Sequence, residues 1–96
     1  MTRQELLTKL RNAKATLRDE FGIEEIALFG SFARDEATEM SDVDIAILSA
    51  EKKDYFNRVN AKYFLEETLH RNVDLGYYDT IRPLLQRSIR RELIHV

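Results

Sequence analysis

Residues 28–48 read LFGSFARDEATEMSDVDIAIL, and this stretch decides which fold the chain adopts. An apolar run ends at a Gly-Ser pair, and a second run, rich in β-branched residues, follows after a polar connection. Short apolar runs bounded by glycine and polar residues are typical of buried β-strands. The stretch therefore predicts two strands joined by a turn at Gly30-Ser31.

The second predicted strand, residues 42–48, places two carboxylates on one face. Side chains alternate between the faces of a strand, so Asp42 and Asp44 point the same way, with their Cα atoms roughly 6–7 Å apart. The β-branched residues between and after them point into the core. Ionised carboxylates at this spacing repel each other unless a cation lies between them. Aspartate is also unfavourable in strands. The pattern favours a functional cation site over a merely solvated strand face.

A third carboxylate, Asp74, lies in a further predicted strand at residues 72–78, on the same face as Gly76. If this strand pairs with the second one, Asp74 lies beside Asp42 and Asp44. Three oxygen donors on a rigid sheet suit a hard cation, Mg²⁺ or Mn²⁺, and do not suit zinc. Because Mg²⁺ is usually bound by one or two carboxylates together with substrate phosphates, the predicted ligand is a nucleotide.

The remaining elements predict a small α/β (α+β) domain over residues 1–96, with helices on a mixed sheet of three or four strands. Thr2 and Glu5 form a predicted capping box, Gly22 a predicted left-handed helix end, and Pro83 a predicted first turn. Apolar periodicity predicts helices over residues 3–21, 54–70 and 83–92, a brief helical turn over 32–36, strands over 23–29, 42–48 and 72–78, and a short strand or frayed end over 93–96.

Glycine between a strand and a short helix lets the backbone approach a ligand closely. The exposed N–H groups at the start of such a helix favour an anion, for example a triphosphate, and Ser31 adds a hydroxyl donor. A Gly-Ser turn is a weak signal alone. It becomes much stronger at a set distance from the strand that carries Asp42 and Asp44.

Gly30-Ser31, then ten residues, then Asp42-Val43-Asp44 resembles the GSx10DxD signature of the polymerase-β-like nucleotidyltransferases. The segment from Asn72 to Leu75 is similar to the strand that carries the third carboxylate of that superfamily. The resemblance spans essentially the whole chain, in the short form known as minimal nucleotidyltransferases. It implies a polymerase-β palm-like fold.

The resemblance also implies a set of site residues. Asp42 and Asp44 would hold two Mg²⁺ ions (Mn²⁺ being the alternative), which clamp the attacking and leaving oxygens of a phosphoryl substitution. Asp74 would share one metal ion and act as the general base for an incoming hydroxyl group. The nucleotide substrate would be an NTP, with ATP expected.

The resemblance further implies that the turn at Gly30-Ser31 binds phosphates. Gly30 and Ser31 would hold the β- and γ-phosphates, and Arg34 is a candidate contact for a phosphate or a partner. One departure stands out, because this chain has Asp35 where the family often has glycine after the arginine. A carboxylate there would either close the loop through a local cap or weaken triphosphate binding.

Stand-alone minimal nucleotidyltransferases resemble the antitoxin half of two-component modules whose partner is a small helical HEPN ribonuclease toxin. The implied activity is AMP transfer from ATP to a tyrosine hydroxyl of the toxin. Two alternatives stay open at this point. One is a non-catalytic antitoxin that occludes its partner, and the other is transfer to a small molecule, as in antibiotic-modifying relatives.

Composition sets further bounds. With 44% hydrophobic and 33% charged residues the chain is expected to be globular. The absence of cysteine excludes disulfides, thiolate zinc sites and a cysteine nucleophile. No apolar run long enough to span a membrane and no signal peptide are recognised, so a cytoplasmic location is expected. A homo-oligomer is compatible with the small size.

The net charge and its distribution limit the kinds of partner that are expected. The net charge of −2 disfavours direct nucleic-acid binding. Four arginines near the C-terminal end are expected to lie on a solvated helix face, with an acidic partner or RNA as the alternative reading: Arg82, Arg87, Arg90 and Arg91.

Overall fold

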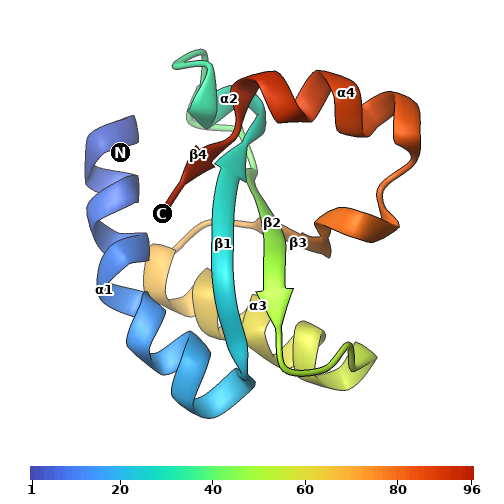
Figure 1. The fold of residues 1–96 in the computed structure, drawn as a ribbon. Helices are drawn as coiled ribbons and strands as arrows, with labels where there is room; N and C mark the ends of the chain where they lie inside the picture. The colour runs from blue at the N-terminus through green and yellow to red at the C-terminus, as the bar shows by residue number, and fades with distance from the viewer.

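Four α-helices and one four-stranded sheet make up the computed structural model, which describes all residues from Met1 to Val96 (Figure 1). In chain order the elements are α1 (Arg3–Phe21), β1 (Ile23–Phe29), α2 (Gly30–Ala33), β2 (Val43–Ala50), α3 (Tyr55–Leu69), β3 (Val73–Tyr77), the 3-10 turn η1 (Tyr78–Thr80), α4 (Pro83–Glu92) and β4 (Ile94–His95).

The strands form a mixed sheet in the order β3-β2-β1-β4. Strand β1 pairs antiparallel with both β2 and β4, whereas β2 and β3 run parallel. A parallel pair needs a crossover connection, and helix α3 supplies it. The predicted mixed sheet is confirmed, and the last residues add its fourth strand.

Helices α1 and α3 pack against the sheet and against each other, while α4 crosses near the end of β1, where α2 begins (Figure 1). The most deeply buried aliphatic side chains come from α1, α3 and three strands: Leu6, Leu10, Leu17, Leu28, Val43, Ile45, Leu65 and Leu75. Burial of each such side chain stabilises the fold by about 1.5–3 kcal/mol. Because Val43 and Ile45 point into this core, Asp44 between them is turned to the other face of the sheet.

The ends of α1 form as predicted. The Thr2 side chain accepts a hydrogen bond from the Glu5 N–H, and the Glu5 carboxylate accepts one from the Thr2 N–H, which completes the capping box. Gly22 adopts a left-handed conformation with φ 64°. Both ends are specified by local hydrogen bonding, which is why the sequence pattern located them.

Several predicted boundaries shift in the structure. Strand β2 begins at Val43, so Asp42 precedes it, and the strand runs on to Ala50. The short helix begins at Gly30 itself and not at Phe32, because Gly30 lies directly at the end of β1. Helix α3 is one residue shorter at each end, with Asp54 as its N-cap and His70 as its C-cap.

The residues that α3 buries in the core are not its largest apolar residues. Ala61, Leu65 and Leu69 recur every four residues and pack into the core. Phe56 and Tyr63 lie on the other side of the helix and are 75% and 60% exposed.

Helix α4 buries only Ile89, and Pro83 occupies its first turn as predicted. Its three arginines, Arg87, Arg90 and Arg91, and the N-cap residue Arg82 are exposed, in agreement with a solvated helix face. No helix combines the length and the apolar character needed to cross a membrane.

Candidate active site

The Gly30 turn lies at the end of β1 and touches the strand that carries Asp44. In the β1–β2 register Phe29 pairs with Asp44, so the next residue, Gly30, lies directly beside that aspartate. Gly30 has φ 76°, and a Cβ atom added there would collide with the Asp44 carboxylate. Both the backbone conformation and the close approach therefore require glycine. The two halves of the sequence motif are in physical contact.

Asp44 and Asp74 are register partners on the parallel strands β2 and β3. Adjacent strands lie about 4.8 Å apart, so the two aspartates are immediate neighbours on the face opposite the core. Asp42 lies two residues before Asp44 and is exposed. The second and third strands do pair, which was the condition for grouping the carboxylates. The pairing brings Asp74 beside Asp44, and Asp42 lies just before the strand that carries Asp44.

The electrostatics of this cluster are unfavourable without a cation. Burial is the main cause that raises the pKa of Asp44 to about 6, and the charges of Asp74 and Asp42 raise it further. Arg34 opposes this shift, and Glu92 adds to it. Asp44 therefore lies in an excess of negative charge, which a bound cation would relieve.

The donor set fits a hard cation in its chemistry, because all its members are carboxylate oxygens. As the side chains stand, however, no three histidine, cysteine, aspartate or glutamate residues are grouped closely enough to hold a metal ion. The excess of negative charge at Asp44 favours a bound cation, whereas the carboxylates around it are not spaced as a complete metal site. The strand register that crowds the carboxylates is set by the core, whereas each carboxylate can rotate about its side-chain bonds to approach a cation. The metal role of Asp42, Asp44 and Asp74 stays a prediction.

Ser31 and Arg34 occupy the short helix and its end. Ser31 is half-buried, and its carbonyl oxygen accepts a hydrogen bond from the Glu36 N–H at 2.8 Å, which closes the turn. Arg34 forms ion pairs with Glu92 at 2.9 Å and with Glu36 at 3.6 Å. The structure thus places both predicted phosphate contacts at the Gly30 turn, and Arg34 already has acidic partners.

Asp35 has φ 60°, in the left-handed region that glycine enters without strain. This explains why a glycine suits that position. Aspartate tolerates the conformation better than most residues, so the turn keeps its shape.

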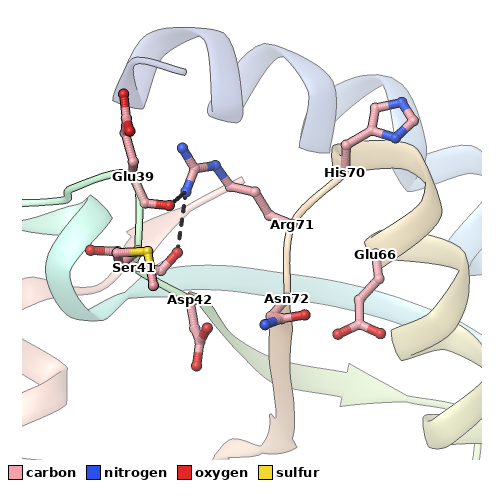
Figure 2. Close-up of a pocket in the computed structure, with 8 residues that line it drawn as sticks. Glu39, Ser41, Asp42, Glu66, His70, Arg71 and Asn72 are labelled. Atoms are coloured by element: carbon pink, nitrogen blue, oxygen red, sulfur yellow. Dashed lines mark hydrogen bonds between the residues drawn. The ribbon is translucent and has the colours of Figure 1, made fainter.

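Arg71 was not singled out by the sequence, yet it holds the loop before Asp42 in place. Its Nη1 atom donates to the carbonyl oxygens of Glu39 at 3.2 Å and Ser41 at 3.3 Å (Figure 2). The guanidinium also lies 5.2 Å from the ring centre of Phe32. No sequence pattern marks this role, because an arginine that follows a helix is commonly a surface residue.

A largely polar cavity of about 600 Å³ opens beside this loop. Figure 2 shows Asp42, Asn72 and Glu66 along its wall, with Arg71 reaching across to the loop. The Glu66 carboxylate accepts a hydrogen bond from the Val73 N–H at 2.9 Å, which fixes the start of β3 next to Asp74. The cavity gives a polar ligand access to the edge of the sheet at Asp42.

Comparison with known proteins agrees with this geometry. Residues 10–96 match the family described as nucleotidyltransferase domain. The protein adenylyltransferase MntA of Thermococcus cleftensis is 33% identical over 96 residues, which cover 100% of this chain and 97% of that protein. A solved structure of a proposed minimal nucleotidyltransferase superposes with a TM-score of 0.80 at 32% identity, covering 98% of this chain and 95% of the other.

A more distant likeness supports the fold alone. One chain in the solved structure of a tri-AMPylated Shewanella oneidensis HEPN toxin in complex with an MNT antitoxin superposes with a TM-score of 0.71. Its sequence identity is 22%, and the match covers 98% of this chain and 71% of that one.

Proposed function

The chain belongs to the nucleotidyltransferase domain family, and from this premise we propose that it is a protein adenylyltransferase. It transfers AMP from ATP to a hydroxyl group of a partner protein and releases pyrophosphate. One observation carries the proposal: the Gly30 turn lies against Asp44, which is the register partner of Asp74. Donors for phosphates and acceptors for cations thus lie side by side, as nucleotidyl transfer requires.

The chemistry is an in-line substitution at the α-phosphorus of ATP. The acceptor oxygen forms a bond to this phosphorus, the bond to the bridging oxygen of the β-phosphate breaks, and pyrophosphate leaves with the electron pair. The hydroxyl proton moves to a carboxylate. We assign that role to Asp74, because it is exposed on the edge strand β3, where a hydroxyl group of a partner can reach it.

Binding of the phosphates falls to the turn between β1 and β2. The Gly30 N–H, the Ser31 hydroxyl and the Arg34 guanidinium are the donors in this region, and the strand register holds Gly30 beside Asp44. A guanidinium suits phosphate oxygens because its planar set of N–H groups can form two parallel hydrogen bonds.

Asp42, Asp44 and Asp74 would hold two Mg²⁺ ions, or Mn²⁺ in their place. When bound, these ions would neutralise charge on the phosphates and lower the pKa of the attacking hydroxyl group. Asp44 and Asp74 project from the paired strands β2 and β3, and Arg71 holds the loop from which Asp42 projects.

The proposed partner is a small helical toxin of the HEPN class, and the proposed acceptor is a tyrosine hydroxyl. The name of the Thermococcus cleftensis relative supports transfer of AMP to a protein, and the Shewanella oneidensis complex supports a HEPN toxin as that protein. Exposed apolar side chains on α3 and α4 provide surface for a protein partner: Tyr55, Phe56, Tyr63, Leu84 and Leu85.

The experiment is mass spectrometry of the co-expressed partner after incubation with Mg²⁺ and each NTP in turn. The wild-type protein is compared with the Asp42→Ala/Asp44→Ala double variant. A matched control, Asp19→Ala/Glu20→Ala, removes two exposed carboxylates of α1 away from the sheet edge. We expect an AMP adduct with the wild type and the control, and none with the site variant.

Two other results would change the conclusion. No adduct with any NTP, together with unchanged inhibition of the partner by the site variant, would indicate an antitoxin that acts by occlusion. An adduct carrying another nucleotide would keep the transfer reaction and correct the choice of ATP.

A further inference from the structure

The carboxylate of Glu92, the last residue of α4, lies at the turn to which the phosphates are assigned. Its Oε1 atom accepts a hydrogen bond from the Gly30 N–H at 3.1 Å, and its Oε2 atom pairs with Arg34 Nη1 at 2.9 Å. The side chain is only 20% exposed. An anionic group of this protein thus occupies two of the donors that would receive the phosphates of a nucleotide.

Glu92 and a phosphate cannot share all these donors. The Gly30 N–H has a single hydrogen, which points either to Glu92 or to a phosphate oxygen. The Arg34 guanidinium has several N–H groups, but pairing with Glu92 satisfies part of its charge. Binding of a triphosphate must therefore displace Glu92 from Gly30.

The contact also has an electrostatic cost. Glu92 brings negative charge close to Asp44, which already faces Asp74 and Asp42. The charge of Arg34 opposes this repulsion and favours the charged form of Asp44. The contacts of Glu92 with Gly30 and Arg34 therefore work against the repulsion between its carboxylate and Asp44.

Helix α4 is lightly attached, which allows Glu92 to withdraw. Ile89 is the only buried residue of the helix, and the strand β4 that follows pairs with β1 at two positions, Ala27 and Leu28. Leu84 and Leu85 on α4 are 81% and 54% exposed. Gln86 and Arg90 add hydrogen bonds to Tyr78, so the helix is held mainly by polar contacts near the surface, and its end can move without opening the core.

We propose that Glu92 is an internal competitor for the phosphate site and sets its affinity for nucleotides. In the nucleotide-free protein its carboxylate occupies the Gly30 N–H and Arg34, and a nucleoside triphosphate binds as Glu92 is released. The inference rests on the proposed function, since it takes the turn at Gly30 as the site of the phosphates. It adds an affinity-determining residue from the opposite end of the chain.

The first test compares the affinity for ATP with Mg²⁺ by isothermal titration calorimetry. Glu92→Gln removes the charge at constant size, and Glu92→Ala removes both hydrogen bonds. Glu36→Gln is the matched control, because Glu36 also pairs with Arg34 but does not contact Gly30. We expect both Glu92 variants to bind about tenfold more tightly than the wild type. The control should stay within about twofold.

The second readout needs no activity. In amide NMR spectra of the nucleotide-free protein, the Gly30 resonance should shift in Glu92→Gln and stay unchanged in Glu36→Gln. Addition of ATP with Mg²⁺ to the wild type should shift the resonances of Gly30 and of residues 89–92 together. Circular dichroism checks that each variant keeps its helices.

The outcomes separate the two claims. If the wild type binds ATP and the Glu92 variants bind it equally or more weakly, the competitor role is wrong and Glu92 only braces the turn. If neither the wild type nor any variant binds a nucleotide, the proposed function fails, and the competitor role fails with it.

Discussion

Asp44 and Asp74 face each other as register partners in the one parallel strand pair of this sheet. Their strands are held by buried residues on the opposite face, so the aspartates cannot separate without disturbing the core. The fold therefore maintains two neighbouring carboxylates, although their charges repel.

The stability of the metal-free protein should fall as the pH rises from about 4 to 6. Burial and the charges of Asp74 and Asp42 raise the folded-state pKa of Asp44 to about 6 from its ordinary value of 3.8, so the folded state binds more protons than the unfolded state in this range. Because the side chain is half-exposed, solvent screening reduces the effect to about 1 kcal/mol.

Urea denaturation across this pH range measures the effect. Asp44→Asn should flatten the slope, and Mg²⁺ should stabilise the wild type more than this variant. A slope that survives in Asp44→Asn would show that another group is responsible.

Replacement of Gly30 by alanine should strongly destabilise the protein. The new Cβ would collide with the Asp44 carboxylate, and the alanine would have to adopt a positive φ, so we expect a loss of at least about 2 kcal/mol in the free energy of unfolding. Gly76→Ala is the matched control, because nothing lies within 4 Å of a Cβ added there.

Chemical denaturation of the two variants provides the comparison. Equal losses of stability would contradict the close packing of Gly30 against Asp44.

Arg71→Ala should slow AMP transfer by about tenfold, because it releases the carbonyl oxygens of Glu39 and Ser41 that hold the loop before Asp42. Arg71→Lys should recover part of the rate, since one ammonium group cannot replace the fork of the guanidinium. Initial rates of adduct formation give the measurement. Arg87→Ala, which removes an exposed arginine of α4, should have little effect. Unchanged transfer by Arg71→Ala would rule out the positioning role.

Two substitutions of Asp35, which has a positive φ of 60°, are expected to change the stability of the protein in opposite directions. Glycine relieves the strain of the left-handed conformation, so Asp35→Gly should stabilise the protein by about 0.5 kcal/mol. Asp35→Ala should destabilise it by a similar or larger amount. Thermal melting of both variants tests the sign, and a shift in the same direction for both would contradict the role of φ.

Local patterns in the sequence determined much of the fold. The capping box at Thr2 and Glu5 and the glycine at position 22 placed both ends of α1, because these residues form hydrogen bonds with their own neighbours. Alternation along β2 correctly predicted that Val43 and Ile45 are buried. These features depend on contacts within a few residues, which a linear pattern records.

Position along the chain also carried part of the site. The spacing from Gly30 and Ser31 to Asp42 and Asp44 predicted that they act together, and the register of β1 and β2 brings Gly30 against Asp44. From the sequence, Asp74 was expected beside Asp44 only if their two strands pair. The parallel register of β2 and β3 shows that they do.

Contacts between distant parts of the chain were decided only by the tertiary structure. Arg71 reaches the carbonyl oxygens of residues 39 and 41, and Glu92 reaches Gly30 from the far end of the chain. An arginine after a helix and a glutamate at a helix end are ordinary in sequence, and nothing local distinguishes them. Their roles arise when the core brings α3, α4 and the turn after β1 together, because hydrogen bonds depend on distance in space and not on separation along the chain.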